Sequence, residues 1–158
     1  MSRTAIAVVG SGDTPLSTAA VQLAFEVGSE IAIVGAVLIC GGRRGIMQAA
    51  AEGARSHGGM TIGILPGYDR ADANPAIEYV IATGMGQARN VIIVASADAV
   101  IALEGEGGTL SEIGLALKLG RPVVAVRAWR ELATIAHAED PREAVERALQ
   151  LTGRAPSR

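Results

Sequence analysis

Short aliphatic runs that end in glycine-rich turns, each followed by a helical pattern, recur along this chain. Three such turns occupy residues 10–12, 41–45 and 105–108. Val, Ile, Leu and Ala fill the runs, and only 3% of the 158 residues are aromatic, which is typical of strands buried on both faces of a parallel sheet. The alternation predicts an α/β fold, a Rossmann-like doubly wound parallel sheet.

The boundaries of the predicted elements come from cap and breaker residues. Pro15, after a Thr14 cap, predicts a first helix that ends near Gly28. Strands are expected at residues 5–9, 36–40, 61–65, 77–81, 99–103 and 122–126, and further helices at 46–57, 86–96, 110–119 and 141–151. These elements form one expected domain, residues 1–153, and residues 154–158 are expected to be a frayed tail.

Several classes of protein are excluded by composition. No window reaches the ~18 consecutive apolar residues of a membrane span and no signal-peptide layout precedes the first strand, so a soluble, cytoplasmic protein is expected. A net charge of −2 favours no nucleic-acid partner. Cys40 is the only cysteine and is expected to be a small buried hydrophobe. His57 and His137 have no metal-ligand cluster around them, so neither a metal nor a cofactor is expected.

The octapeptide GEGGTLSE, residues 105–112, predicts a binding site for an anion. Gly105, Gly107 and Gly108 let a ligand approach the main chain, and Thr109 opens a helix whose free N–H groups favour a phosphate. A second interpretation needs no ligand, because Thr109 and Glu112 also have the spacing of a capping box.

The other glycine-rich turns are expected at the same edge of the sheet, because all three follow strands and precede helices. The predicted ligand site therefore also includes Gly10, Ser11, Gly12, Gly42 and Arg43. A dinucleotide is not favoured: Pro15 stands where a small residue is needed. No acidic residue follows the second strand; Arg43 and Arg44 are found there, which leaves NADP only as a remote alternative.

Arg89 is expected in the first turn of a helix, where the helix dipole disfavours a cation by ~0.3–1 kcal/mol. A locally unfavourable residue at the ligand edge indicates a functional role. The alternative is an arginine that points to solvent or pairs with a nearby carboxylate.

These motifs together resemble the Lonely Guy superfamily, whose members carry G-G-x-x-G-[IL]-M, M-H-x-R and P-G-G-x-G-T-x-x-E in that order. The matching stretches here are GGRRGIM at residues 41–47, Met85 to Arg89, and GEGGTLSE. The resemblance implies a Rossmann-like fold in a homodimer or homotetramer. It also implies Arg89 and Glu112 as catalytic residues, which in the enzymes cleave the N-glycosidic bond of a nucleoside 5′-monophosphate.

The chain departs from the enzyme pattern in two places. Glu104 and Glu106 flank the turn in place of Pro-Gly-Gly, and the histidine before the arginine is missing. The sequence around these motifs is closer to a compact branch of the superfamily that is similar to molybdenum cofactor carrier proteins. Those proteins bind a phosphorylated pterin without consuming it. Two hypotheses remain open: a binding protein for a phosphorylated small molecule, and a phosphoribohydrolase.

Some members of the superfamily have been labelled lysine decarboxylases. A pyridoxal-phosphate enzyme needs a lysine for its Schiff base, and Lys118 is the only lysine. It falls about two turns into the predicted helix, near its C-terminal end, so the chain is not expected to be a lysine decarboxylase.

Overall fold

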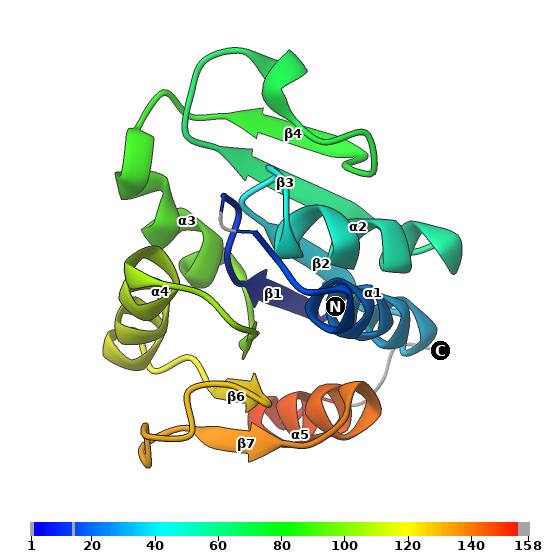
Figure 1. Cartoon of the computed structure of the whole chain (residues 1–158), viewed down its shortest axis with the longest axis vertical. Coiled ribbons are helices and arrows are strands. Elements are labelled where there is room, and N and C mark those ends of the chain that lie inside the picture. Colours follow the sequence, from blue (N-terminus) through cyan, green and yellow to red (C-terminus); the bar gives the residue numbers. More distant parts are fainter. Residues whose placement is uncertain (1, 14, 155–158) are drawn as a thin grey trace.

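Seven parallel strands in one sheet, with helices on both faces, make up the fold (Figure 1). The computed structural model describes residues 2–13 and 15–154. Its strands are β1 (Ala5–Val9), β2 (Val37–Cys40), β3 (Thr61–Leu65), β4 (Tyr79–Ala82), β5 (Ala99–Ala102), β6 (Val123–Val126) and β7 (Ala136–Ala138). Its α-helices are α1 (Thr18–Ile33), α2 (Ile46–Ser56), α3 (Arg89–Ser96), α4 (Gly107–Lys118) and α5 (Pro141–Thr152). Two short 3₁₀ helices, η1 (Arg70–Asp72) and η2 (Gly86–Ala88), complete the described elements.

The strand order is β4-β3-β2-β1-β5-β6-β7. The chain first builds outward from β1 to β4, then returns to the other side of β1 and builds outward again to β7. The direction of winding therefore reverses between β1 and β5, and this confirms the predicted doubly wound sheet.

Two aliphatic cores lie against the two faces of the sheet. One lies under α1, α2 and α5, and the other under α3 and α4 (Figure 1). All six predicted strands are present, and β2, β5 and β6 are buried at every position, as expected for parallel strands. Cys40 is fully buried, as predicted.

The first helix was predicted wrongly at both ends. It begins at Thr18, with the Ser17 side chain accepting a hydrogen bond from the Ala20 N–H at 3.1 Å, and Pro15 lies outside it. Thr14, the predicted cap, lies outside the described residues. Gly28 lies inside the helix, at the point where the backbone of α2 crosses it. A Cβ on Gly28 would stand 1.8 Å from the Ala50 carbonyl oxygen. The glycine permits a close helix crossing and does not end the helix.

Other differences are smaller. β7 was not predicted, because its three residues carry no aliphatic run. The predicted tail, 154–158, lies outside the described residues except for Arg154, whose guanidinium pairs with the Asp98 carboxylate at 3.1 Å. No helix in the described parts of the chain is both long and apolar enough to cross a membrane.

Candidate functional site

A cavity of about 450 Å³ opens at the carboxyl ends of the central strands, where the winding of the sheet reverses. Ligands of α/β proteins bind in this position, because the loops that leave neighbouring strands diverge there. Eight of the predicted site residues line the cavity: Gly10, Ser11, Gly12, Arg43, Arg89, Gly108, Thr109 and Glu112.

Backbone hydrogen bonds hold the three glycine-rich turns together at this edge. Ser11 N–H donates to the Glu104 carbonyl at 2.9 Å, and Ile46 N–H donates to the Ser11 carbonyl at 3.0 Å. Gly10 is required by packing, since a Cβ there would stand 2.5 Å from the Ile46 side chain. The turn after β1 thus joins the turns after β2 and β5, as the sequence predicted.

Three predicted ligand residues do not line the cavity. Gly42, at a φ of 75°, packs on β3, where a Cβ would lie 3.2 Å from Gly63 Cα. Gly105 leaves room for Thr109, whose Oγ1 lies 2.1 Å from the position of a Gly105 Cβ. Gly107 is exposed as the first residue of α4. Packing alone therefore explains why Gly42 and Gly105 are glycines, without a ligand.

The capping box interpretation of the turn is wrong. Helix α4 begins at Gly107, two residues before Thr109, and its N-cap residue Glu106 makes no side-chain capping bond. Two consecutive glycines allow the helix to start early, and this moves Glu112 into the second turn. Thr109 and Glu112 are three positions apart on one face of α4, and both are buried in the wall of the cavity.

Arg89 is the first residue of α3 and so lies in the first turn of this helix, as predicted, and it does not point to solvent. It is only 8% exposed, and its Nη1 donates a hydrogen bond to Oδ1 of Asn90. The distance from Arg89 Nη1 to Glu112 Oε1 is 3.9 Å, an ion pair that is too long for a hydrogen bond. Arg89 Nε–H has no partner within the described residues.

Gly41 makes room for this arginine. A Cβ on Gly41 would stand 2.9 Å from Arg89 Nη2 and 2.7 Å from Met47 Sδ. The glycine is therefore needed for the guanidinium to lie across the end of β2, inside the cavity.

Burial governs the electrostatics of the cavity. It raises the pKa of Glu112 to about 7, against the opposing attraction of Arg89, and it lowers the pKa of Arg89. Burial also raises the pKa of the Cys40 thiol, just below the site, to about 11. The ionised Glu112 can accept a proton or stabilise a nearby cation, whereas protonated Glu112 can donate a hydrogen bond. The unpartnered Arg89 N–H is suited to an anionic oxygen.

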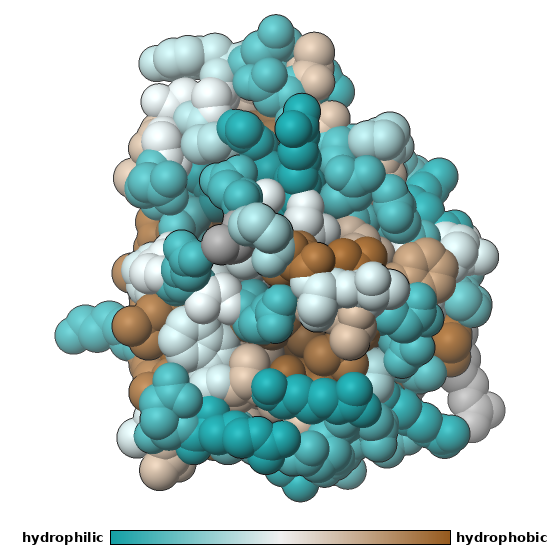
Figure 2. Space-filling view, in the orientation of Figure 1, coloured by the Kyte–Doolittle hydropathy of each residue, from teal (hydrophilic) through white to brown (hydrophobic). Residues whose placement is uncertain are grey.

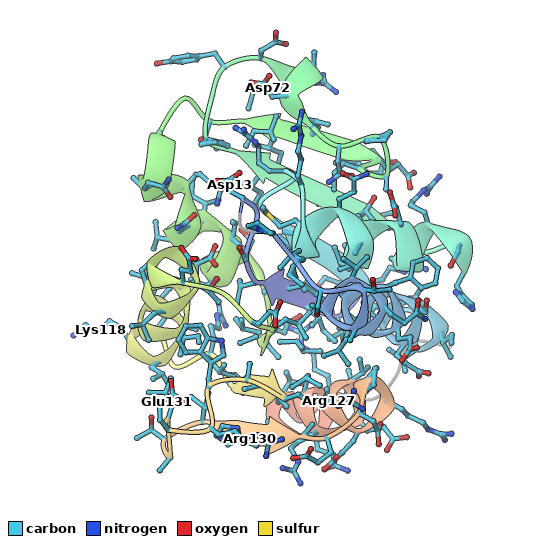
Figure 3. The ribbon with its side chains drawn as sticks, in the orientation of Figure 1. Asp13, Asp72, Lys118, Arg127, Arg130 and Glu131 are labelled. Atoms are coloured by element: carbon cyan, nitrogen blue, oxygen red, sulfur yellow. The ribbon has the colours of Figure 1, made fainter. Side chains whose placement is uncertain are left out.

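The rim of the cavity is exposed and carries both signs of charge, from Asp13, Arg43 and Glu106, together with the amide of Gln87. Asp13 stands at the tip of the turn between β1 and α1 (Figure 3). Asn90 was missed by the sequence analysis, although a polar residue directly after Arg89, at the start of an otherwise apolar helix, was the available signal.

Lys118 is not among the residues that line the cavity. It is the exposed last residue of α4, and its side chain extends away from the molecule (Figure 3). Within the described parts of the chain, no three His, Cys, Asp or Glu residues come together as metal ligands.

The fold and the cavity define a Rossmann-like α/β protein with a polar pocket at the switch point of its sheet. The model of the SLOG cluster4 family, a Lonely Guy-like family, matches residues 3–152, and the chain belongs to this family.

Known proteins resemble the chain in structure and in sequence. A molybdenum cofactor binding protein from Rippkaea orientalis has a TM-score of 0.90 and 35% identity, over 96% of this chain and 98% of that one. The molybdenum cofactor carrier protein of Chlamydomonas reinhardtii has a TM-score of 0.89 and 32% identity, over 97% and 100% of the two chains. A cytokinin riboside 5′-monophosphate phosphoribohydrolase of Mycobacterium tuberculosis is 34% identical over 126 residues, 73% of this chain and 67% of that protein.

Proposed function

We propose that this protein binds a phosphorylated small molecule, of the pterin or nucleotide type, in the cavity at the switch point. The observation that carries the proposal is the buried Arg89 guanidinium, whose Nε–H has no protein partner among the described residues. A buried donor of this kind needs an acceptor, and a phosphate oxygen supplies one.

The start of α4 gives the proposed phosphate a second set of donors. Gly108 and Thr109 line the cavity within the first turn of this helix, where backbone N–H groups have no intrahelical partners. The two molybdenum cofactor proteins named above favour a pterin phosphate as the ligand, held without chemical change.

A phosphoribohydrolase is the second candidate, and the Arg89–Glu112 pair is the observation that favours it. A carboxylate with a pKa near 7 can assist attack by water, or stabilise the positive charge that develops on a ribose as its glycosidic bond breaks. The mycobacterial relative supports this alternative.

Native mass spectrometry of the purified protein for a retained ligand is the first test. A thermal-shift titration with inorganic phosphate and AMP follows, because a ligand that binds only the folded state raises the melting temperature. Gly108→Val, which puts a branched side chain at the mouth of the proposed phosphate site, should abolish the shift. Gly114→Val is the matched control, since Gly114 is also an exposed glycine of α4 with free space around it but lies outside the cavity. Equal shifts in both variants would place the anion elsewhere.

Release of ribose 5-phosphate from nucleoside monophosphates separates the two functions. If the protein is a hydrolase, Glu112→Gln and Arg89→Ala should each lower turnover ~10²-fold or more. No release by the wild type would remove the enzyme hypothesis and leave the binding function. Full activity of Glu112→Gln would show that this carboxylate has no part in the reaction.

We further propose that the protein is a homo-oligomer that uses the outer surface of α3, α4 and β4. Tyr79 and Ile81 pair with Ile62 and Ile64 of β3, so their side chains lie on the α3 face of the sheet, yet both are about half exposed. Val91 of α3 and Leu110 and Leu117 of α4 are further exposed apolar side chains of these elements. Hydrophobic atoms gather over α3 and α4 at the left margin of Figure 2. A second copy of the chain is the proposed partner.

A further inference from the structure

Arg89 stands between two acceptors and contacts only one of them. Its Nη1 donates to Asn90 Oδ1, whereas Glu112 Oε1 is 3.9 Å away. All three side chains are buried, with exposed fractions of 8% for Arg89, 4% for Asn90 and 7% for Glu112. A buried guanidinium would bind the carboxylate directly if nothing held it elsewhere, because such charge-assisted pairs are the strong ones.

Two neighbours decide where the guanidinium lies. Gly41 provides the space, since a Cβ there would stand 2.9 Å from Arg89 Nη2. Asn90 provides the acceptor, from the adjacent position of the same helix turn. Glu112 lines the cavity, and the distance of 3.9 Å that separates its Oε1 from Arg89 Nη1 leaves this ion pair without a direct hydrogen bond.

We infer that Asn90 is a positioning residue that holds Arg89 out of hydrogen-bond contact with Glu112, and so keeps both groups open to the ligand. The ligand half of this inference rests on the proposed function. Two atoms 3.9 Å apart can both lie ~2.8 Å from one bridging oxygen, so an oxygen that carries both a proton and a lone pair is suited to bridge Arg89 Nη1 and Glu112 Oε1. There it accepts from Arg89 and donates to the Glu112 carboxylate.

The charge state of Glu112 reports on this arrangement. The charged group that acts on Glu112 is Arg89 from α3, which favours its ionised form. Cys40 from β2 is the other titratable group nearby, and because burial raises its pKa to about 11, the thiol is uncharged where Glu112 titrates. Arg43 acts on Arg89 from the rim. Burial outweighs the attraction of Arg89 while Arg89 stays at 3.9 Å, so the pKa of Glu112 is raised to about 7.

The test is the titration of the Glu112 side-chain carboxyl carbon by NMR in ¹³C-glutamate-labelled protein, with Glu112→Gln to assign the resonance. Asn90→Leu keeps the branching at Cγ but removes the acceptor, so Arg89 should close on Glu112 and lower the midpoint of the Glu112 titration by ~1 unit or more. Asn90→Asp keeps the acceptor and adds a negative charge, so the midpoint should stay at or above the wild-type value. Opposite behaviour of two substitutions at one position is not expected from a merely structural role.

Ile93→Val is the matched control, because Ile93 is fully buried in the same helix but lies outside the cavity. It should lower stability and leave the midpoint unchanged. The inference is overturned if Asn90→Leu titrates like the wild type, or if Asn90→Leu and Asn90→Asp lower the midpoint together.

Affinity for AMP gives the second readout. Asn90→Leu should weaken binding ~10-fold, since each lost charge-assisted bond is worth about 1.5 kcal/mol or more. Unchanged affinity in Asn90→Leu would overturn the ligand half of the inference. A wild type that binds neither AMP nor phosphate would count against the proposed function, while the titration would still decide the role of Asn90.

Discussion

The helices on the two faces of the sheet differ in what they pack against and in which residues they bury. On one face α1 and α2 cross at two glycines, Gly28 and Gly53, where each would place a Cβ 1.8 Å from a carbonyl oxygen of the other helix. On the other face α3 and α4 supply the buried polar residues of the cavity. The first pair is packed in close backbone contact and the second lines the cavity, although both pairs are rich in aliphatic residues.

Glycine shows the difference most clearly. Gly53 in α2 is buried against the Phe25 backbone, whereas Gly114 in α4 is exposed and has nothing within 4 Å of a Cβ. Both occupy helix interiors, where glycine costs up to ~1 kcal/mol relative to alanine. Only the first is compensated by packing.

The largest expected effect comes from adding one methyl group at the α1–α2 crossing. Gly53→Ala should destabilise the protein by ~3 kcal/mol, because the two backbones must separate. Gly114→Ala is its counterpart on α4 and should stabilise the protein by about 0.5 kcal/mol, since it relieves the cost of a helical glycine without a clash. Urea denaturation measures both free energies of unfolding. Equal effects would contradict the contrast between the two layers.

The next effect concerns the pH dependence of stability through Glu112. Because burial raises its pKa from 4.5 to about 7 in the folded protein, the folded state holds a proton that the unfolded state releases in this window. The free energy of unfolding should therefore fall as the pH rises from about 4.5 to about 7, and stay lower above it. Glu112→Gln removes this slope and should be more stable than the wild type at pH 8, by up to ~3 kcal/mol.

At pH 4 the same two proteins should have nearly equal stability, because Glu112 is then protonated in both states. Glu104→Gln serves as the control, since Glu104 is an exposed carboxylate of the same turn that lies outside the main cavity. It should keep the wild-type slope. A Glu112→Gln protein that is less stable than the wild type at pH 8 would show that the buried carboxylate is stabilising when ionised.

The smallest expected change in fold stability comes from breaking self-association. Leu117→Glu on α4 should dissociate the proposed oligomer without unfolding the protomer, because Leu117 is 43% exposed. Leu151→Glu on α5, where the leucine is 52% exposed on the opposite face, is the control and should leave the assembly intact. Sedimentation at micromolar concentration distinguishes the species. A wild type that sediments only as a 16.1 kDa particle would refute the proposed assembly.

Much of the fold could be predicted because local patterns carry it. The aliphatic runs predicted all the described strands except β7, and the three glycine-rich turns predicted the edge of the sheet at which the cavity lies. Arg89 at the start of α3 could likewise be predicted, since its position depends only on where the apolar helix begins.

The remaining features depend on neighbours that are distant in sequence. From the sequence, Gly28 predicts the end of a helix. The reason for the glycine is the backbone of α2, which crosses α1 at this residue. Glu112 reads as part of a cap until the early start of α4 turns it toward Arg89.

The sequence alone therefore determined six of the seven described strands, the doubly wound class of the sheet and the edge at which the glycine-rich turns meet, because strand and turn propensities are local. Tertiary structure alone decided that Glu112 is buried, that Asn90 binds Arg89 and that Gly42 and Gly105 serve packing. Burial and side-chain pairing depend on which segments meet in space. No local pattern in the sequence specifies the 3.9 Å that separates Arg89 from Glu112.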